Sequence, residues 1–201
     1  MASRVCDDGG EPRLKLAPME LNEELSTADV VLLLGSVPER TSDLVQWLGD
    51  AQLRYRHGPA FPTLKELVAH LARSGTAIDA LLRQVCIEGR REVDLQAAMD
   101  PAPEPGPETS AADLVESLMR DRRRTVDLLR GLTDEEWAQP VQDAVRGQLT
   151  LLDLCDAIGR HEAGHVTQLR NLIAVLPEPL DLGPIVPAGN GRPAGPTVPP
   201  G

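Results

Sequence analysis

Residues 151–172, LLDLCDAIGRHEAGHVTQLRNL, carry the clearest helical pattern in the chain. Apolar side chains, two histidines and a glutamine recur there at steps of three and four, at Leu151, Leu154, Ile158, His161, His165, Gln168 and Leu172. An α-helix places residues at these steps on one face, and such a face packs against the core of a helical bundle. The pattern therefore predicts a helix over 151–176 with both histidines on its buried stripe.

Working outward, four segments show the signature of a helix start, in which a hydroxyl residue precedes an acidic residue by three positions. They are Thr63-Leu-Lys-Glu66, Ser110-Ala-Ala-Asp113, Thr133-Asp-Glu-Glu136 and Thr150-Leu-Leu-Asp153. We expect long helices over 28–48, 64–87, 111–129 and 151–176, with a bend or restart of the first near Gly35 to Pro38 and a short helical turn at 134–138. Because strand signals are almost absent, the sequence predicts an all-α fold.

The two ends of the chain differ in composition from its middle. Residues 177–201 contain 13 prolines and glycines among 25 residues, too many for a helix and with few groups to bury. We interpret 1–20 and 177–201 as disordered segments and 21–176 as one four-helix domain. The Pro-rich run 101–107 is interpreted as a crossover loop between helices.

Composition limits the function classes. A formal charge of −11 argues against nucleic acid as a partner, because basic patches supply most of that affinity. The start of the chain shows no charged leader followed by a long apolar segment, so we expect neither secretion nor a membrane span. Three scattered cysteines, Cys6, Cys86 and Cys155, give no disulfide framework, and a cytoplasmic location fits them best.

Three of the four histidines suggest a metal site. His161 and His165 are four residues apart, so their side chains stack about 6 Å apart on one helix face and can reach one cation. His70 lies on a second stripe, formed by Leu67, His70, Ser74, Ala77 and Leu81, and is the best third ligand if the two helices are neighbours. The alternative is that these are hydrogen-bonded core histidines, although a shared metal would satisfy all of them. His57 is interpreted as a loop residue that at most lines the mouth of the site.

His161-Glu162-Ala-Gly-His165 also matches the zinc-protease motif, in which the glutamate is a general base. The context disfavours that interpretation. Downstream of His165 only Glu178 and Asp181, both in the Pro-rich segment, could serve as a third ligand, and the longer form of the motif has a glycine and a histidine where this chain has Gln168 and Asn171.

Several segments, in order, resemble the DinB-like (DinB/YfiT) superfamily over roughly residues 28–176. They are the lead-in to His70 (Asp50-Ala-Gln-Leu53 through Tyr55, then Gly58 to Leu71), the turn Leu132-Thr-Asp-Glu-Glu-Trp137, and the final helix with Leu149-Thr-Leu-Leu-Asp153 and His161 to Arg170. One departure is Pro62-Thr63, where the family often has Trp-Ser; the threonine can still cap the helix.

The resemblance implies an up-up-down-down four-helix bundle in which His70, His161 and His165 hold a divalent metal. Three nitrogen ligands leave a position open for water or substrate, as in catalytic sites. Zinc and nickel are both compatible with imidazole ligands. Characterised relatives include mycothiol-dependent isomerases and bacillithiol S-transferases. A composition rich in Ala, Arg, Pro and Gly is typical of high-GC actinobacteria, in which mycothiol is the expected thiol.

The leading hypothesis is a transferase or isomerase that activates a low-molecular-weight thiol on the metal and delivers it to an electrophilic substrate. A metal-binding stress or regulatory protein without turnover is an alternative. A metal-dependent hydrolase assisted by Glu162 or Gln168 is another. Gln168, one turn beyond His165, is the candidate catalytic residue and is expected to orient the substrate or support the site; the alternative is a buried amide bonded to a neighbouring helix. Glu66 is expected to cap its helix, with support of the site as a secondary role. The resemblance leaves a homodimer open.

Overall fold

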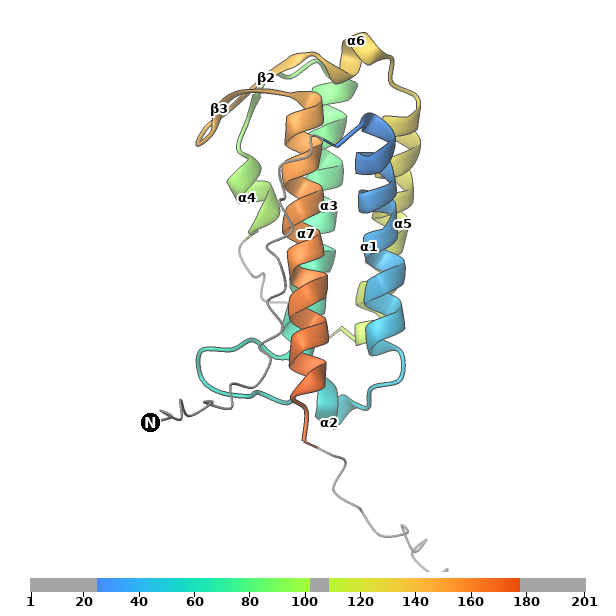
Figure 1. Ribbon diagram of the computed structural model, residues 1–201, viewed down its shortest axis with the longest axis vertical. Coiled ribbons are helices and arrows are strands. Elements are labelled where there is room, and N and C mark those ends of the chain that lie inside the picture. The colour runs from blue at the N-terminus through green and yellow to red at the C-terminus, as the bar shows by residue number, and fades with distance from the viewer. Residues whose placement is uncertain (1–24, 102–108, 178–201) are drawn as a thin grey trace, which may run out of the picture.

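Four long helices form a bundle in the computed structural model, which describes residues 25–101 and 109–177 (Figure 1). They are α1 (Thr27–Val45), α3 (Leu64–Cys86), α5 (Ala111–Arg130) and α7 (Leu151–Ala174). The expected all-α fold is confirmed. The one marked difference in bounds is α1, which passes through Pro38 as a single helix and ends at Val45 instead of 48.

The helix starts form as the sequence predicts. At α7, Thr150 Oγ1 accepts a hydrogen bond from the Asp153 amide at 3.1 Å, and Asp153 Oδ2 accepts one from the Thr150 amide at 2.8 Å. Equivalent reciprocal pairs begin α1, α3 and the short helix α6 (Asp134–Trp137), and at α5 the Ser110 side chain accepts from the Asp113 amide. These bonds satisfy amides that would otherwise have no partner at a helix start, and so fix where each helix begins.

The four helices pack in the cyclic order α3, α5, α1, α7, each contacting the next, and α7 contacting α3. In Figure 1, α3 and α5 run up while α1 and α7 run down. The expected four-helix bundle is therefore found, but along the chain the directions follow as down, up, up, down instead of up-up-down-down. Around the bundle, α3 and α5 form one adjacent parallel pair and α1 and α7 form the other. Gly159 permits the close approach of α1 and α7, because a Cβ there would lie 2.8 Å from Leu33 Cδ2.

A small sheet and two further short helices depart from the sequence-based prediction. The sheet joins β1 (Glu92–Val93), β2 (Pro140–Asp143) and β3 (Gly147–Thr150), with β1 and β2 parallel and β2 and β3 antiparallel. The buried Asp143 carboxylate holds it together by accepting hydrogen bonds from the Leu95, Val145 and Arg146 amides. The added helices are α2 (Asp50–Leu53) and α4 (Leu95–Met99). α4 packs against both α3 and α7.

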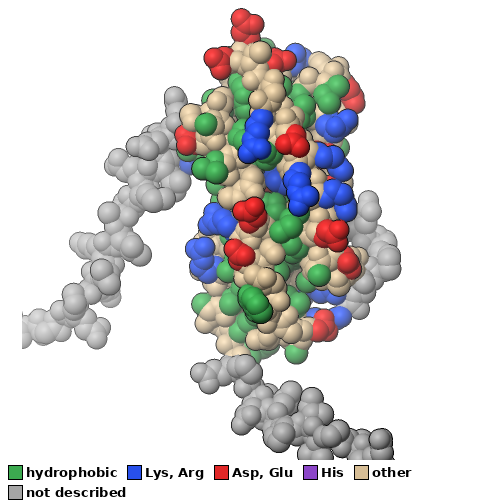
Figure 2. All heavy atoms as spheres, turned by 90° about the vertical axis from the view of Figure 1, so that its right-hand side faces the viewer, with side chains coloured by type: hydrophobic (Ala, Val, Ile, Leu, Met, Phe, Trp, Pro, Cys, Tyr) green, Lys and Arg blue, Asp and Glu red, His purple; other side chains and the backbone are tan. Residues whose placement is uncertain are grey.

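The expected disordered segment 1–20, the segment 178–201 and most of the 101–107 loop lie outside the described residues. Within 25–101 and 109–177, no helix combines the length and apolarity that a membrane crossing requires. On the face formed by α1 and α5, acidic, basic and hydrophobic side chains are interspersed, and no histidine is seen among the side chains described there (Figure 2).

Candidate metal centre

Three histidines from two neighbouring helices meet at the edge between α3 and α7. His70 comes from the first half of α3, and His161 and His165 come from adjacent turns of α7. One ligand atom from each lies within 4.8 Å of the other two, and all three side chains are half-buried. Ring centroids are 4.5 Å apart for His161 and His165 and 4.6 Å for His70 and His165. The structure thus brings together the residues that the sequence singled out.

The Nε2 atoms of these histidines suit a shared ion. His161 Nε2 and His165 Nε2 lie 3.1 Å apart, close to the spacing of two nitrogens that are each about 2.0–2.1 Å from one tetrahedral metal. His70 Nε2 is buried and has no hydrogen-bond partner among the described residues. A buried ring nitrogen without a partner is costly, and a metal ion would provide one. The donor set therefore fits a divalent metal.

The other ring nitrogens face protein groups. His165 Nδ1 lies 3.2 Å from Gln168 Oε1, and His70 Nδ1 lies 3.8 Å from Asp100 Oδ1. His161 makes a backbone hydrogen bond with Met99. A hydrogen bond from the second ring nitrogen to an oxygen fixes the tautomer and the orientation of a ligand imidazole, and the His165–Gln168 contact is of this kind. Gln168 thus holds His165, and is not a buried amide bonded to a neighbouring helix.

Met99 and Asp100 are site residues that the sequence did not indicate. Met99 ends α4 and Asp100 directly follows it. They reach the histidines because α4 packs across the edge where α3 and α7 meet. A five-residue helix inside a connecting segment gives no periodic signal that could place these two residues beside His70 and His161.

Burial favours the neutral form of two of these imidazoles, His70 and His161. Burial, with a further effect from His165, lowers the pKa of His70 from its ordinary 6.5 to about 4. Burial and His165 also lower the pKa of His161, while the Met99 hydrogen bond acts in the opposite direction. A neutral imidazole is the form that binds metals, so both side chains are ready to do so at neutral pH.

The position of the histidines on α7 differs from the prediction. The buried stripe of the second half of this helix consists of Glu162, Val166 and Leu169, while His161 and His165 are half-buried beside it. The deviation arises because steps of three and four describe two adjacent stripes equally well, and only the packing of α7 against α1 and α3 selects between them. The consequence is a site at the bundle edge instead of its interior.

Glu162, the glutamate of the protease-like motif, faces away from this site. Its side chain is fully buried and accepts a hydrogen bond from Arg122 of α5, itself 2 % exposed. Burial raises the pKa of Glu162, and the Arg122 guanidinium opposes that effect. A carboxylate held in the core cannot act as a general base at the metal, so the expectation that Glu162 might assist hydrolysis is not supported by its position.

The remaining sequence candidates lie elsewhere. His57 is exposed and packs edge-on against Phe61, with ring centroids 5.6 Å apart. The Glu66 carboxylate accepts from the Thr63 amide and from Arg56, so it caps α3 as expected. Burial raises the pKa of Cys86 to about 11 and raises that of the fully buried Cys155 further. Neither cysteine is a thiolate at neutral pH, so neither is suited to be a nucleophile.

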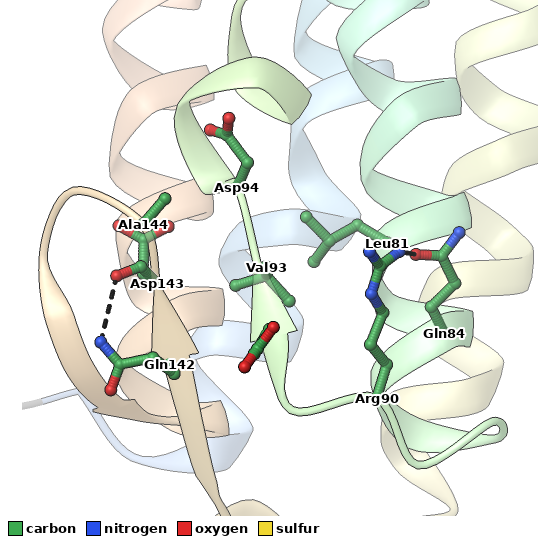
Figure 3. Close-up of a pocket in the computed structure, with 9 residues that line it drawn as sticks. Leu81, Gln84, Arg90, Val93, Asp94, Gln142, Asp143 and Ala144 are labelled. Atoms are coloured by element: carbon green, nitrogen blue, oxygen red, sulfur yellow. Dashed lines mark hydrogen bonds between the residues drawn. The ribbon is translucent and has the colours of Figure 1, made fainter.

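A cavity of about 520 Å³ opens between the end of α3, β1 and β2 (Figure 3). The residues that line it include Leu81, Val93 and Gln142, and Arg90 donates a hydrogen bond to Gln84 at its rim. None of its lining residues is one of the three histidines. It is therefore separate from the candidate metal centre.

A four-helix bundle with three convergent imidazoles at its edge defines a helical protein with a candidate metal site. The family model of the DinB superfamily matches residues 33–169, so this chain belongs to that superfamily. No protein of curated function matches the chain.

Two solved structures from Bacillus subtilis share the fold. YfiT, described as a probable metal-dependent hydrolase with an unusual four-helix bundle topology, is 19 % identical with a TM-score of 0.57, over 79 % of this chain and 93 % of that one. The DinB-like protein YjoA is 21 % identical with a TM-score of 0.52, over 74 % of this chain and 96 % of that one. At these identities the likeness shows the fold alone.

Proposed function

We propose that this protein is a metal-dependent enzyme that uses a small thiol, of the mycothiol type, as a transferase or isomerase. The observation that carries the proposal is the convergence of three imidazoles on one point, with His70 Nε2 buried and without a partner among the described residues. A divalent ion held by three nitrogens keeps a position open for a further ligand, and it lowers the pKa of a thiol or water bound there.

The surrounding residues favour a thiol over water. The Glu162 carboxylate accepts a hydrogen bond from Arg122 in the core, and Gln168 Oε1 lies within hydrogen-bond distance of His165 Nδ1. Both residues that we expected to assist a hydrolase are thus engaged elsewhere. A thiol, with an ordinary pKa of about 8.5, is deprotonated outright on a zinc ion, whereas water bound to zinc still has a pKa between about 7 and 9. A site with few bases therefore suits a nucleophile that ionises without one.

In the proposed transfer, the thiol sulfur forms a bond to an electrophilic carbon of the substrate, whose leaving group departs with its electron pair. The thiol proton goes to solvent. The protein holds the three imidazoles in place through Gln168, Asp100 and Met99, and supplies no nucleophile of its own.

The test compares turnover with and without thiol. Protein loaded with zinc or nickel is mixed with 1-chloro-2,4-dinitrobenzene and either mycothiol or N-acetylcysteine, and release of chloride with formation of the thioether is followed. We expect a rate that saturates with thiol and is lost in His161→Ala but kept in His57→Ala. Equal rates in wild type, His161→Ala and buffer, for both thiols, would contradict the proposal.

A hydrolase is the second candidate, and one observation favours it. The exposed Asp100 carboxylate, 3.8 Å from His70 Nδ1, is a base at the edge of the site that could accept a proton from water. YfiT is described as a probable metal-dependent hydrolase. Hydrolysis of p-nitrophenyl acetate by metal-loaded protein in the absence of thiol, lost in Asp100→Asn, would support this candidate. A metal-binding protein without turnover would show bound metal and neither activity.

A further inference from the structure

Arg73 lies on α3 one turn after His70, and both side chains are half-buried. Residues three apart on a helix are neighbours on its surface. The positive charge of Arg73 also contributes to lowering the pKa of His70, as expected for two side chains that lie close together. Arg73 therefore borders the side of the candidate metal centre that α3 provides.

Within the described residues, the Arg73 guanidinium has no hydrogen-bond or ion-pair partner. Its Nε is buried without a hydrogen bond, and among residues 25–101 and 109–177 no acidic side chain forms an ion pair with it. By contrast, Arg122 and Arg124 on α5 both bind carboxylates of neighbouring helices. A buried N–H donor without an acceptor, such as Arg73 Nε, costs free energy unless a ligand supplies the acceptor.

The charged side chains near the three histidines favour the binding of an anion. The acidic side chain of Asp100 lies beside His70 Nδ1, and 68 % of this side chain is exposed. On the α7 side, the positive charge of Arg146 contributes to lowering the pKa of His161. Arginine on each flank and a cation between them would create a strongly positive surface.

We infer that Arg73 binds an anionic oxygen group, a carboxylate or a phosphate, of the molecule that occupies the open metal position. The planar guanidinium matches such groups with two parallel hydrogen bonds and has an unused donor at Nε. This inference rests on the metal site of the proposed function and narrows its substrates to anionic ones. The anionic group could belong to the thiol or to the other substrate.

The experiment uses the full chain loaded with Co²⁺, whose visible absorption responds to added ligands. Wild type, Arg73→Gln and Arg83→Gln are titrated with acetate and with inorganic phosphate. Arg83 is the matched control, because it is an exposed arginine on the same helix. We expect Arg73→Gln to weaken binding of at least one anion about tenfold or more, because a charge-assisted pair is lost, while Co²⁺ uptake is unchanged. Arg83→Gln should match wild type.

A second arm identifies the source of the anionic group. The same proteins are titrated with 3-mercaptopropionate and with the neutral 3-mercapto-1-propanol. An Arg73-dependent preference for the carboxylate thiol assigns the group to the thiol. Arg73-dependent acetate or phosphate binding without any thiol-to-cobalt absorption supports the inference and contradicts the thiol-dependent function. Anion affinities that are equal in wild type and Arg73→Gln, or no anion binding in wild type, would overturn the inference, as would a wild type that takes up no Co²⁺.

Discussion

Arg122 on α5 donates a hydrogen bond to Glu162 on α7, in the core directly behind the metal-facing His161. In this pair, the glutamate of the protease-like motif makes a structural contact between two helices. It also orients α7, because a helix whose Glu162 points to the core must present its neighbour His161 toward the bundle edge.

We predict that Glu162→Ala acts on stability. Removing one partner leaves Arg122 as an uncompensated buried charge, so the free energy of unfolding in urea should fall by about 3–5 kcal/mol. The double variant Arg122→Met, Glu162→Leu should recover most of that loss, because it removes both charges and keeps the volume. If Glu162→Ala kept the wild-type stability and lost activity, Glu162 would instead belong to the catalytic machinery.

Gln168 is predicted to be a positioning residue. Gln168→Ala removes the acceptor for His165 Nδ1 and should weaken metal affinity about 10–100-fold in competition with a chelator. Gln168→Glu keeps an acceptor oxygen and should retain most of the affinity. Unchanged metal affinity in Gln168→Ala, together with a lower kcat, would show that Gln168 contacts the substrate instead.

Asp100 gives a parallel prediction for the α4 side. Asp100→Ala should lower metal affinity roughly tenfold, because the carboxylate beside His70 Nδ1 makes that imidazole a better ligand. Asp127→Ala is the control, since Asp127 is an exposed acid on α5. The same chelator competition measures the metal affinity of both variants, and equal affinities would show that Asp100 does not support the metal site.

Stability of the metal-free protein should depend on pH through His70. Because the pKa of His70 falls from 6.5 to about 4 on folding, the unfolded chain binds a proton between these values that the folded chain does not. The contribution of neutral His70 to the free energy of unfolding is therefore complete above pH 6.5 and is lost as the pH falls toward 4. Urea midpoints across this window should decline in wild type and decline less in His70→Gln. Parallel profiles would show that His70 is ordinarily protonated in the fold.

Local signals predicted the helices well. A hydroxyl and an acid three residues apart satisfy helix-start amides wherever they occur, so Thr63, Ser110, Thr133 and Thr150 mark true starts. The strands were missed because each spans two to four residues, and β1 pairs with β2, which lies far from it along the chain.

The site was predictable only in part. The spacing of His161 and His165 and the place of His70 follow from the sequence, and the structure brings all three together. Sequence periodicity could not tell whether they lie in the core or at its edge, since Glu162 occupies the adjacent stripe. The places of Met99 and Asp100 beside the histidines depend on how α4 packs across α3 and α7, which no local pattern encodes.

Metal content tests the account most directly. Wild type, His161→Ala and His57→Ala are purified identically, dialysed against a mixture of Zn²⁺ and Ni²⁺, and analysed by mass spectrometry for bound metal. His57 serves as the control because it is an exposed loop histidine outside the triad. We predict about one ion per chain in wild type and His57→Ala, and almost none in His161→Ala. Equal metal content in all three proteins, or no metal in wild type, would contradict the three-histidine site.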